Sequence, residues 1–104
     1  MTSLVRGAQL ARMLGQWHAL PGKRRSPDYV ALAGAVRGLL ADARLPLGVR
    51  LPAERELAES LRVSRTTVTA AYRELRESGH LNSRRGAGSW TTLPSGHRVA
   101  SSGL

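Results

Sequence analysis

The chain has 104 residues, in which 16 lysine and arginine residues outnumber 7 acidic residues and give a formal net charge of +9. This length allows one small domain with a modest core and leaves no room for a separate catalytic domain. The absence of cysteine excludes disulfides, thiolate zinc sites and cysteine nucleophiles. So large an excess of positive charge in a small domain indicates a polyanionic partner.

The N-terminal segment predicts an amphipathic helix over residues 4–20, because its apolar residues recur at helical spacing. This stripe comprises Leu10, Met13, Leu14 and Trp17. With the basic linker PGKRR that follows, residues 1–25 form an extension whose stripe packs within the molecule or joins two copies. The segment is too polar for a signal peptide, and no apolar run approaches the ~18 residues of a membrane span. We therefore expect a cytoplasmic protein without a membrane partner.

A second helix is predicted to begin at Ser26-Pro27-Asp28 and to end near Arg44. Ser26 suits the N-cap, Pro27 the first helical position, and Asp28 the positive end of the helix dipole. The helix ends because Pro46 disfavours helical backbone before it. Its apolar stripe comprises Tyr29, Leu32, Ala33, Val36, Leu39, Leu40 and Ala43.

Two shorter helices follow a very short strand at residues 49–51. The first is predicted to open at Pro52, and the second spans residues 64–77, with Ser64 as its N-cap. Their apolar stripes comprise Leu57, Ala58 and Leu61 in the first and Val68, Ala71, Tyr72 and Leu75 in the second. Because only about three residues join them, they have the spacing of a helix-turn-helix, with residues 64–77 as the recognition helix.

After this helix, which Gly79 ends as a left-handed C-cap, the apolar period changes from about 3.6 to about 2 residues. This change predicts a β-hairpin with strands at 80–84 and 89–92 around a glycine-rich tip. Leu81 and Trp90 are expected to anchor the hairpin on the helices.

The predicted fold is therefore mainly α with a small β-hairpin. Residues 26–93 form a winged helix-turn-helix, with a three-helix core plus a wing, preceded by the N-terminal amphipathic helix. Residues 94–104 are small and polar and are typical of a linker or tail.

The first turn of the recognition helix favours contact over helix stability. It contains Ser64, Arg65, Thr66 and Thr67. Threonine is a poor helix former, and capping needs only one of these hydroxyls. An arginine here can bind guanine O6 and N7, while the threonine hydroxyls and methyls can meet phosphates, base edges or the thymine methyl group. Beyond this turn the helix also presents Thr69, Arg73 and Arg76.

The hairpin tip combines arginines with glycines. Arg84 and Arg85 precede Gly86 and Gly88, and glycine allows the backbone to approach a surface closely. Arginine side chains suit a narrow, electronegative minor groove. Directly after a helix-turn-helix, we interpret this tip as a wing that contacts DNA.

The acidic and histidine residues do not form a catalytic or metal-binding group. All 7 acidic residues fall at predicted helix positions, where the helix dipole or surface pairing accounts for them. His18, His80 and His97 lie in three different segments and lack metal-ligand spacing. We therefore expect neither a metal site nor an enzyme activity in this chain.

The motif LPAERELAESLRVSRTTVTAAYRELRESGHL, followed by RRGAGSW, resembles the GntR family of bacterial winged-helix repressors from about Tyr29 to Thr92. The Ala71-Tyr72 pair and the wing are more similar to the MocR subfamily. In that subfamily a domain similar to fold-type I aminotransferases, which binds pyridoxal phosphate, follows the winged helix.

The resemblance implies a role for each matching residue. Arg55 would contact the DNA backbone, and Arg85 and Gly86 would form the wing tip. The recognition-helix contacts would come from Ser64, Arg65, Thr66 and Thr67. Thr69 stands where some family members have a further DNA-contacting arginine, which makes this chain different at that contact.

We therefore expect sequence-specific binding of double-stranded operator DNA by a bacterial GntR/MocR-type transcriptional regulator, with residues 64–77 in the major groove and residues 84–88 in the minor groove. Three alternatives stay open: a non-specific architectural nucleic-acid-binding protein, the DNA-binding end of a pyridoxal-phosphate-binding protein, and a truncated regulator without activity. Because no cofactor-binding lysine follows Leu93, we expect no cofactor in this chain, and pyridoxal phosphate only in a C-terminal domain outside it. The isolated chain is expected to be a monomer, with a dimer forming on DNA or through such a domain.

Overall fold

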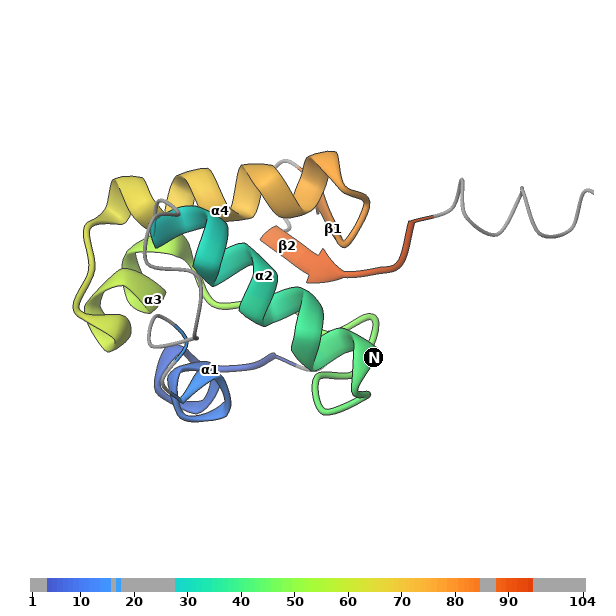
Figure 1. Cartoon of the computed structure of the whole chain (residues 1–104), viewed down its shortest axis with the longest axis horizontal. Helices are drawn as coiled ribbons and strands as arrows, with labels where there is room; N and C mark the ends of the chain where they lie inside the picture. Colours follow the sequence, from blue (N-terminus) through green and yellow to red (C-terminus); the bar gives the residue numbers. More distant parts are fainter. Residues whose placement is uncertain (1–3, 16, 18–27, 85–87, 95–104) are drawn as a thin grey trace, which may run out of the picture.

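Four helices and one β-hairpin make up residues 4–15, 17, 28–84 and 88–94, which are the residues described in this computed structural model. In chain order the elements are α1 (Gly7–Leu14), α2 (Asp28–Ala41), α3 (Glu54–Leu61), α4 (Arg65–Glu77), β1 (Leu81–Arg84) and β2 (Gly88–Thr91). Helices α2 and α3 both pack on α4, α1 packs on α3, and the hairpin follows the C-terminal end of α4 (Figure 1). This is the winged helix-turn-helix predicted from the sequence.

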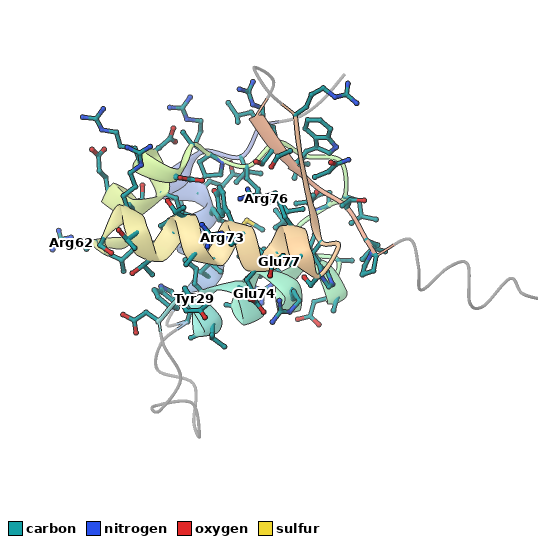
Figure 2. The ribbon with its side chains drawn as sticks, turned by 90° about the horizontal axis from the view of Figure 1, so that it is seen from above. Tyr29, Arg62, Arg73, Glu74, Arg76 and Glu77 are labelled. Atoms are coloured by element: carbon teal, nitrogen blue, oxygen red, sulfur yellow. The ribbon has the colours of Figure 1, made fainter. Side chains whose placement is uncertain are left out.

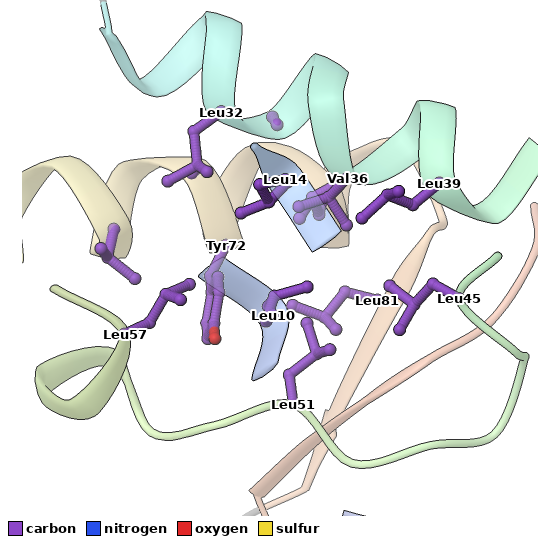
Figure 3. Close-up of a cluster of buried hydrophobic side chains, with 14 of the residues drawn as sticks. Leu10, Leu14, Leu32, Val36, Leu39, Leu45, Leu51, Leu57, Tyr72 and Leu81 are labelled. Atoms are coloured by element: carbon purple, nitrogen blue, oxygen red, sulfur yellow. The ribbon is translucent and has the colours of Figure 1, made fainter. Parts of the chain in front are cut away.

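One hydrophobic core joins the four helices and the hairpin (Figure 3). Its side chains include Leu10 and Leu14 of α1, Leu32, Val36 and Leu39 of α2, Leu57 of α3, Tyr72 of α4 and Leu81 of β1. The stripes predicted for the three later helices largely face this core. The core extends beyond three helices, however, because α1 contributes to it as well.

The N-terminal helix is shorter than predicted. It spans Gly7–Leu14 and not residues 4–20, and Gly15 ends it with a φ of +58°. Leu10 is completely buried, and Leu14 and Trp17 are nearly so. The stripe was predicted either to pack within the molecule or to join two copies, and in the structure it packs within the molecule.

Close contact between α1 and α3 depends on Gly7. The Glu56 carboxylate accepts a hydrogen bond from the Gly7 amide at 2.6 Å and another from the Arg6 guanidinium at 3.2 Å. A Cβ atom at Gly7 would lie 2.7 Å from Ser60 Oγ. The absent side chain therefore allows the approach, and the Glu56 carboxylate stabilises the positive end of α1.

Helix α2 ends at Ala41, so the predicted end near Arg44 was wrong. Ala43 adopts a φ of +61°, and the amides of Ala43 and Arg44 donate to carbonyl groups of the last helical turn. This is a Schellman ending with alanine in the position that glycine usually occupies. It exposes Ala43, which was predicted on the apolar stripe. The predicted start at Ser26 and Pro27 lies outside the described residues.

Helix α3 begins at Glu54, two residues later than the predicted start at Pro52. Pro52 is buried, and its carbonyl oxygen accepts a hydrogen bond of 2.7 Å from the Tyr72 hydroxyl. The segment before α3 is thereby fixed to the middle of α4. Ala53 occupies the N-cap of α3 without a side-chain hydrogen bond.

The wing is joined to the segment before α3 through Arg50 and Thr91. Arg50 forms a parallel bridge with Leu4 and an antiparallel bridge with Trp90, which confirms extended backbone in the short strand predicted there. The buried Thr91 hydroxyl accepts from the Val49 amide at 3.1 Å and donates to a backbone carbonyl at 2.7 Å. Both strands differ by one residue from their predicted bounds, and the buried anchor in β2 is Thr91, whereas Trp90 is half-buried.

Candidate nucleic-acid interface

The hydroxyls at the start of α4 divide into a capping pair and an exposed group. Ser64 Oγ accepts a hydrogen bond from the Thr67 amide at 3.1 Å and lies 3.0 Å from Thr67 Oγ1. Ser64 is therefore the N-cap, as predicted. Arg65 and Thr66 are both exposed, and their side chains form no hydrogen bond or ion pair with other described residues. The first turn thus satisfies its own cap and still presents a cation and a hydroxyl outward.

A short connection sets α4 against α3. Arg62 ends α3 in the left-handed region with a φ of +61°, and the Val63 amide donates to the Ala58 carbonyl at 3.1 Å. Between the helices, Thr69 Oγ1 donates to Glu54 Oε1 at 2.7 Å. Thr69 is half-buried, so its hydroxyl faces α3, while its predicted role is contact with DNA.

Exposed arginine side chains occur on α3, on α4 and on the wing: Arg55, Arg65, Arg73, Arg76 and Arg84. Figure 2 looks onto α4, where Arg73 and Arg76 are labelled along the helix. The Arg55 side chain is 82% exposed and lies 3.8 Å from Glu59. Such exposed pairs are weak, so Arg55 remains available to a stronger anion.

A groove of about 590 Å³ lies between the start of α3, the start of α4 and the wing. Its walls include Arg50, Arg55 and Arg65, together with Gly88 and Ser89 of β2. Several guanidinium groups around one groove favour the binding of a phosphate. The structure therefore brings the predicted Arg55 and Arg65 together and adds Arg50, which was not predicted as a contact.

The wing presents Arg84 over an aromatic ring. The Arg84 guanidinium carbon lies 5.6 Å from the centre of the Trp90 ring, within the range of a cation–π interaction. Trp90 therefore packs on a cation of the wing in addition to its place at the strand. The predicted tip residues Arg85 and Gly86 lie outside the described residues.

A hydroxyl chain connects the wing with α4. Ser83 Oγ lies 2.6 Å from Ser89 Oγ across the two strands, and the Arg76 guanidinium donates to Ser83 at 3.4 Å. Both contacts are hydrogen bonds between side chains, and both lie at exposed positions. These polar contacts therefore help to fix the orientation of the wing relative to the recognition helix.

Two ionisable groups near α4 have shifted pKa values. Burial raises the pKa of the Tyr72 hydroxyl well above its usual range, and the charges of Glu54 and Glu56 add to the rise. Tyr72 therefore remains a hydrogen-bond donor at neutral pH. Burial lowers the pKa of His80 from 6.5, the Arg37 charge acts in the same direction, and a hydrogen bond with Ser78 opposes them.

Within the described ranges, no group of three or more histidine, cysteine or acidic residues is arranged to hold a metal ion. In the same part of the chain, no helix is both long and apolar enough to cross a membrane. Glu54 and Glu56 also line the groove, but both have structural partners, since Glu54 binds Thr69 and Glu56 binds the start of α1.

Sequence reasoning missed three features of this surface: Arg50 on the wall of the groove, the bond from Thr69 to Glu54, and Trp90 beneath Arg84. The alternation of Val49, Arg50 and Leu51 was a usable signal for the first, because the middle residue of such a strand points away from the core. The other two depend on contacts between elements that spacing along the chain does not specify.

Comparison with protein families gives a match over most of this fold. The family model described as bacterial regulatory proteins, gntR family, matches residues 28–90. The match runs from the start of α2 into β2 and so includes α3, α4 and most of the hairpin.

Two curated relatives are similar in the same region. The HTH-type transcriptional regulator Rv0792c of Mycobacterium tuberculosis is 41% identical over 68 residues, which are 65% of this chain and 25% of that protein. A Rhizobium meliloti protein named MocR, assigned to regulation of rhizopine catabolism, is 41% identical over 69 residues, which are 65% of this chain and 14% of that protein. The chain thus spans a quarter or less of the length of these two relatives.

Among solved structures, the AraR DNA-binding domain in complex with operator ORX1 superposes with a TM-score of 0.58. It is 26% identical, and the match covers 64% of this chain and 80% of that domain.

Proposed function

Because the chain belongs to the GntR family of bacterial regulatory proteins, we propose that it binds double-stranded operator DNA with α4 in the major groove and the wing in an adjacent minor groove. The observation that carries the proposal is the first turn of α4, in which the Ser64–Thr67 cap leaves Arg65 and Thr66 exposed. In helix-turn-helix docking, this end of the recognition helix reaches the base edges.

The proposed contacts divide by chemistry. Arg65 reads guanine, because its guanidinium can bind O6 and N7 together. Arg55 and Arg73 bind phosphates on either side of the major groove, which fixes register without reading sequence. Thr69 contributes through its methyl group, since its hydroxyl is engaged by Glu54. The complete proposed set is Arg55, Ser64, Arg65, Thr66, Thr67, Thr69, Arg73, Arg84, Arg85 and Gly86.

The wing contributes through Arg84, Arg85 and Gly86. Trp90 supports this role because it keeps the Arg84 guanidinium on its ring face, 5.6 Å from the ring centre, and so limits the loss of side-chain entropy on binding. A narrow minor groove attracts such a guanidinium through its enhanced negative potential.

The isolated chain is a monomer in solution. On an operator, two copies bind, one to each half-site. Support for a monomer comes from α1, whose apolar stripe is buried inside the fold. The large apolar side chains exposed among the described residues are Leu4, Leu47 and Leu93. They come from three separate segments of the chain. The proposed arrangement on two half-sites is the one that helix-turn-helix dimers generally adopt.

Selection from a library of random duplexes tests the proposal. The expected result is enrichment of one sequence by the wild-type chain and loss of ~1–3 kcal/mol on that site in Arg65→Ala, with relaxed preference at one base pair. Arg55→Ala should weaken selected and random duplexes alike. Arg44→Ala is the matched control, since Arg44 is exposed and does not line the groove. Binding without any enrichment would favour the architectural alternative instead.

A further inference from the structure

Arg50 is an exposed arginine at the junction of the wing and the helix-turn-helix. Resting on the proposed function, we propose that Arg50 is a further DNA contact, which binds a backbone phosphate in the groove between the recognition helix and the wing. The proposal rests on how its backbone is held, where its guanidinium lies and which charges surround it.

The backbone of Arg50 is fixed from two sides. Its carbonyl oxygen accepts a hydrogen bond of 2.9 Å from the Val5 amide, and its bridges join Leu4 on one side and Trp90 on the other. The neighbouring Leu51 amide donates to Ser89 at 2.8 Å. A side chain at this position therefore projects from a rigid base shared by the N-terminal segment and the wing.

The guanidinium of Arg50 lies directly against Gly88. A Cβ atom at Gly88 would stand 2.6 Å from Arg50 Nε and 3.2 Å from its guanidinium carbon. Gly88 has a φ of +93°, a conformation that glycine adopts readily. The missing side chain thus leaves room for the arginine beside the wing, and this packing restricts the long side chain before any ligand binds.

The charges around the groove leave Arg50 available for an anion. Glu54 accepts from Thr69, and Glu56 accepts from Arg6 and the start of α1. Ion pairs between described residues join Arg6 to Glu56 and Arg55 to Glu59, so none of them involves Arg50. Arg50, Arg55 and Arg65 line the same groove from three different segments. A phosphate is the anion that a DNA duplex would supply there.

The test measures how salt weakens DNA binding. Wild type, Arg50→Gln, Arg50→Lys and the control Arg44→Gln are titrated against a labelled duplex of random sequence at several salt concentrations, and their thermal unfolding is recorded. Losing one phosphate contact should reduce the log–log slope by about 0.9, so the affinity ratio between about 50 and about 200 mM salt shrinks about 3.5-fold in Arg50→Gln. Arg50→Lys and Arg44→Gln should keep slopes close to that of the wild type.

The outcomes separate this inference from the proposed function. A wild-type chain that binds no duplex overturns both. Normal wild-type binding with equal slopes for Arg50→Gln and Arg44→Gln overturns the Arg50 contact alone. An equal reduction of the salt slope in Arg50→Gln and Arg50→Lys also overturns the contact, because the arginine would then act only through its packing on Gly88.

Discussion

The Thr69 hydroxyl donates to the Glu54 carboxylate at 2.7 Å and thereby joins the recognition helix to the first turn of the helix before it. The bond spans 15 residues of sequence and lies in a half-buried position. It gives the half-buried Glu54 carboxylate a neutral hydrogen-bond donor. The relative placement of the two helices therefore depends partly on a residue that the family resemblance associates with DNA.

Replacing Thr69 with valine should lower the free energy of unfolding by about 1–2 kcal/mol, because Glu54 would lose the partner of a half-buried carboxylate. Thr69→Ser keeps the hydroxyl and should cost less. Thr66→Val is the control at an exposed position and should change stability by less than about 0.5 kcal/mol. Urea unfolding measures all three, and equal values for the first two would contradict the role of the bond.

Two glycine substitutions in helices should have opposite signs. Gly7→Ala places a Cβ atom 2.7 Å from Ser60 Oγ and 3.0 Å from the Glu56 carbonyl oxygen, so overpacking should destabilise the fold by about 1–3 kcal/mol. A Cβ at Gly38 meets nothing within 4 Å in α2. Gly38→Ala should therefore stabilise by about 0.5–1 kcal/mol. Thermal unfolding decides the comparison, and a stabilised Gly7→Ala would show that α1 is not closely packed on α3.

Tyr72→Phe should destabilise the fold by about 1–3 kcal/mol, since the buried Pro52 carbonyl would lose its hydrogen-bond donor. Tyr29 is half-buried on α2 and offers the same substitution as a control. Chemical unfolding of both variants gives the difference. A Tyr72→Phe variant as stable as Tyr29→Phe would mean that the bond to Pro52 adds nothing to stability.

The elements of α3, α4 and the hairpin were predictable because their signals are local. Ser64 directly precedes an apolar stripe of helical period, and Gly79 follows it with the expected positive φ of +84°. The end of α2 was not predictable, because Ala43 takes a left-handed conformation that sequence rules assign to glycine. Pro52 also misled, since its carbonyl is held by Tyr72 and the helix starts later.

The interface residues that lie on one helix could be predicted from the sequence. Those that depend on contact between two distant segments could not. Arg65 and Thr66 follow from their place after the cap. The environment of Arg50 depends on bridges to Leu4 and Trp90, which are 46 and 40 positions away. Distances of this kind along the chain follow from tertiary packing and not from any local pattern.

Changing Arg84 and Arg85 together to alanine should reduce affinity most on sites with A·T-rich flanks, where the minor groove is narrow. Trp90→Leu should give a smaller loss with the same flank dependence, since it removes the ring that holds Arg84. Binding titrations on duplexes that differ only in their flanks measure both effects. An unchanged flank preference in the double variant would exclude the wing from minor-groove contact.

Stability should decrease as pH falls through about 6.5 because of His80. The pKa of His80 is lowered by burial, so the unfolded chain binds more protons than the folded chain in this range, and protonation favours unfolding. The contribution is present above pH 6.5 and is lost progressively below it. His80→Gln should flatten this part of the profile, as measured by unfolding across pH, and an equally steep profile would assign the effect to other groups.

The Schellman ending of α4 also places Gly79 directly against Pro94. The Gly79 and His80 amides donate to carbonyls of the last helical turn at 3.1 and 2.8 Å, and a Cβ at Gly79 would lie 2.9 Å from Pro94 Cα. Pro94, the last residue that the structure describes, therefore lies beside the C-terminal end of α4. Since α4 has 13 residues, Pro94 lies about 20 Å along the helix from its first turn. A fluorophore or an affinity handle attached at position 94 would stand clear of that turn, whereas one at Ser64 would obstruct it.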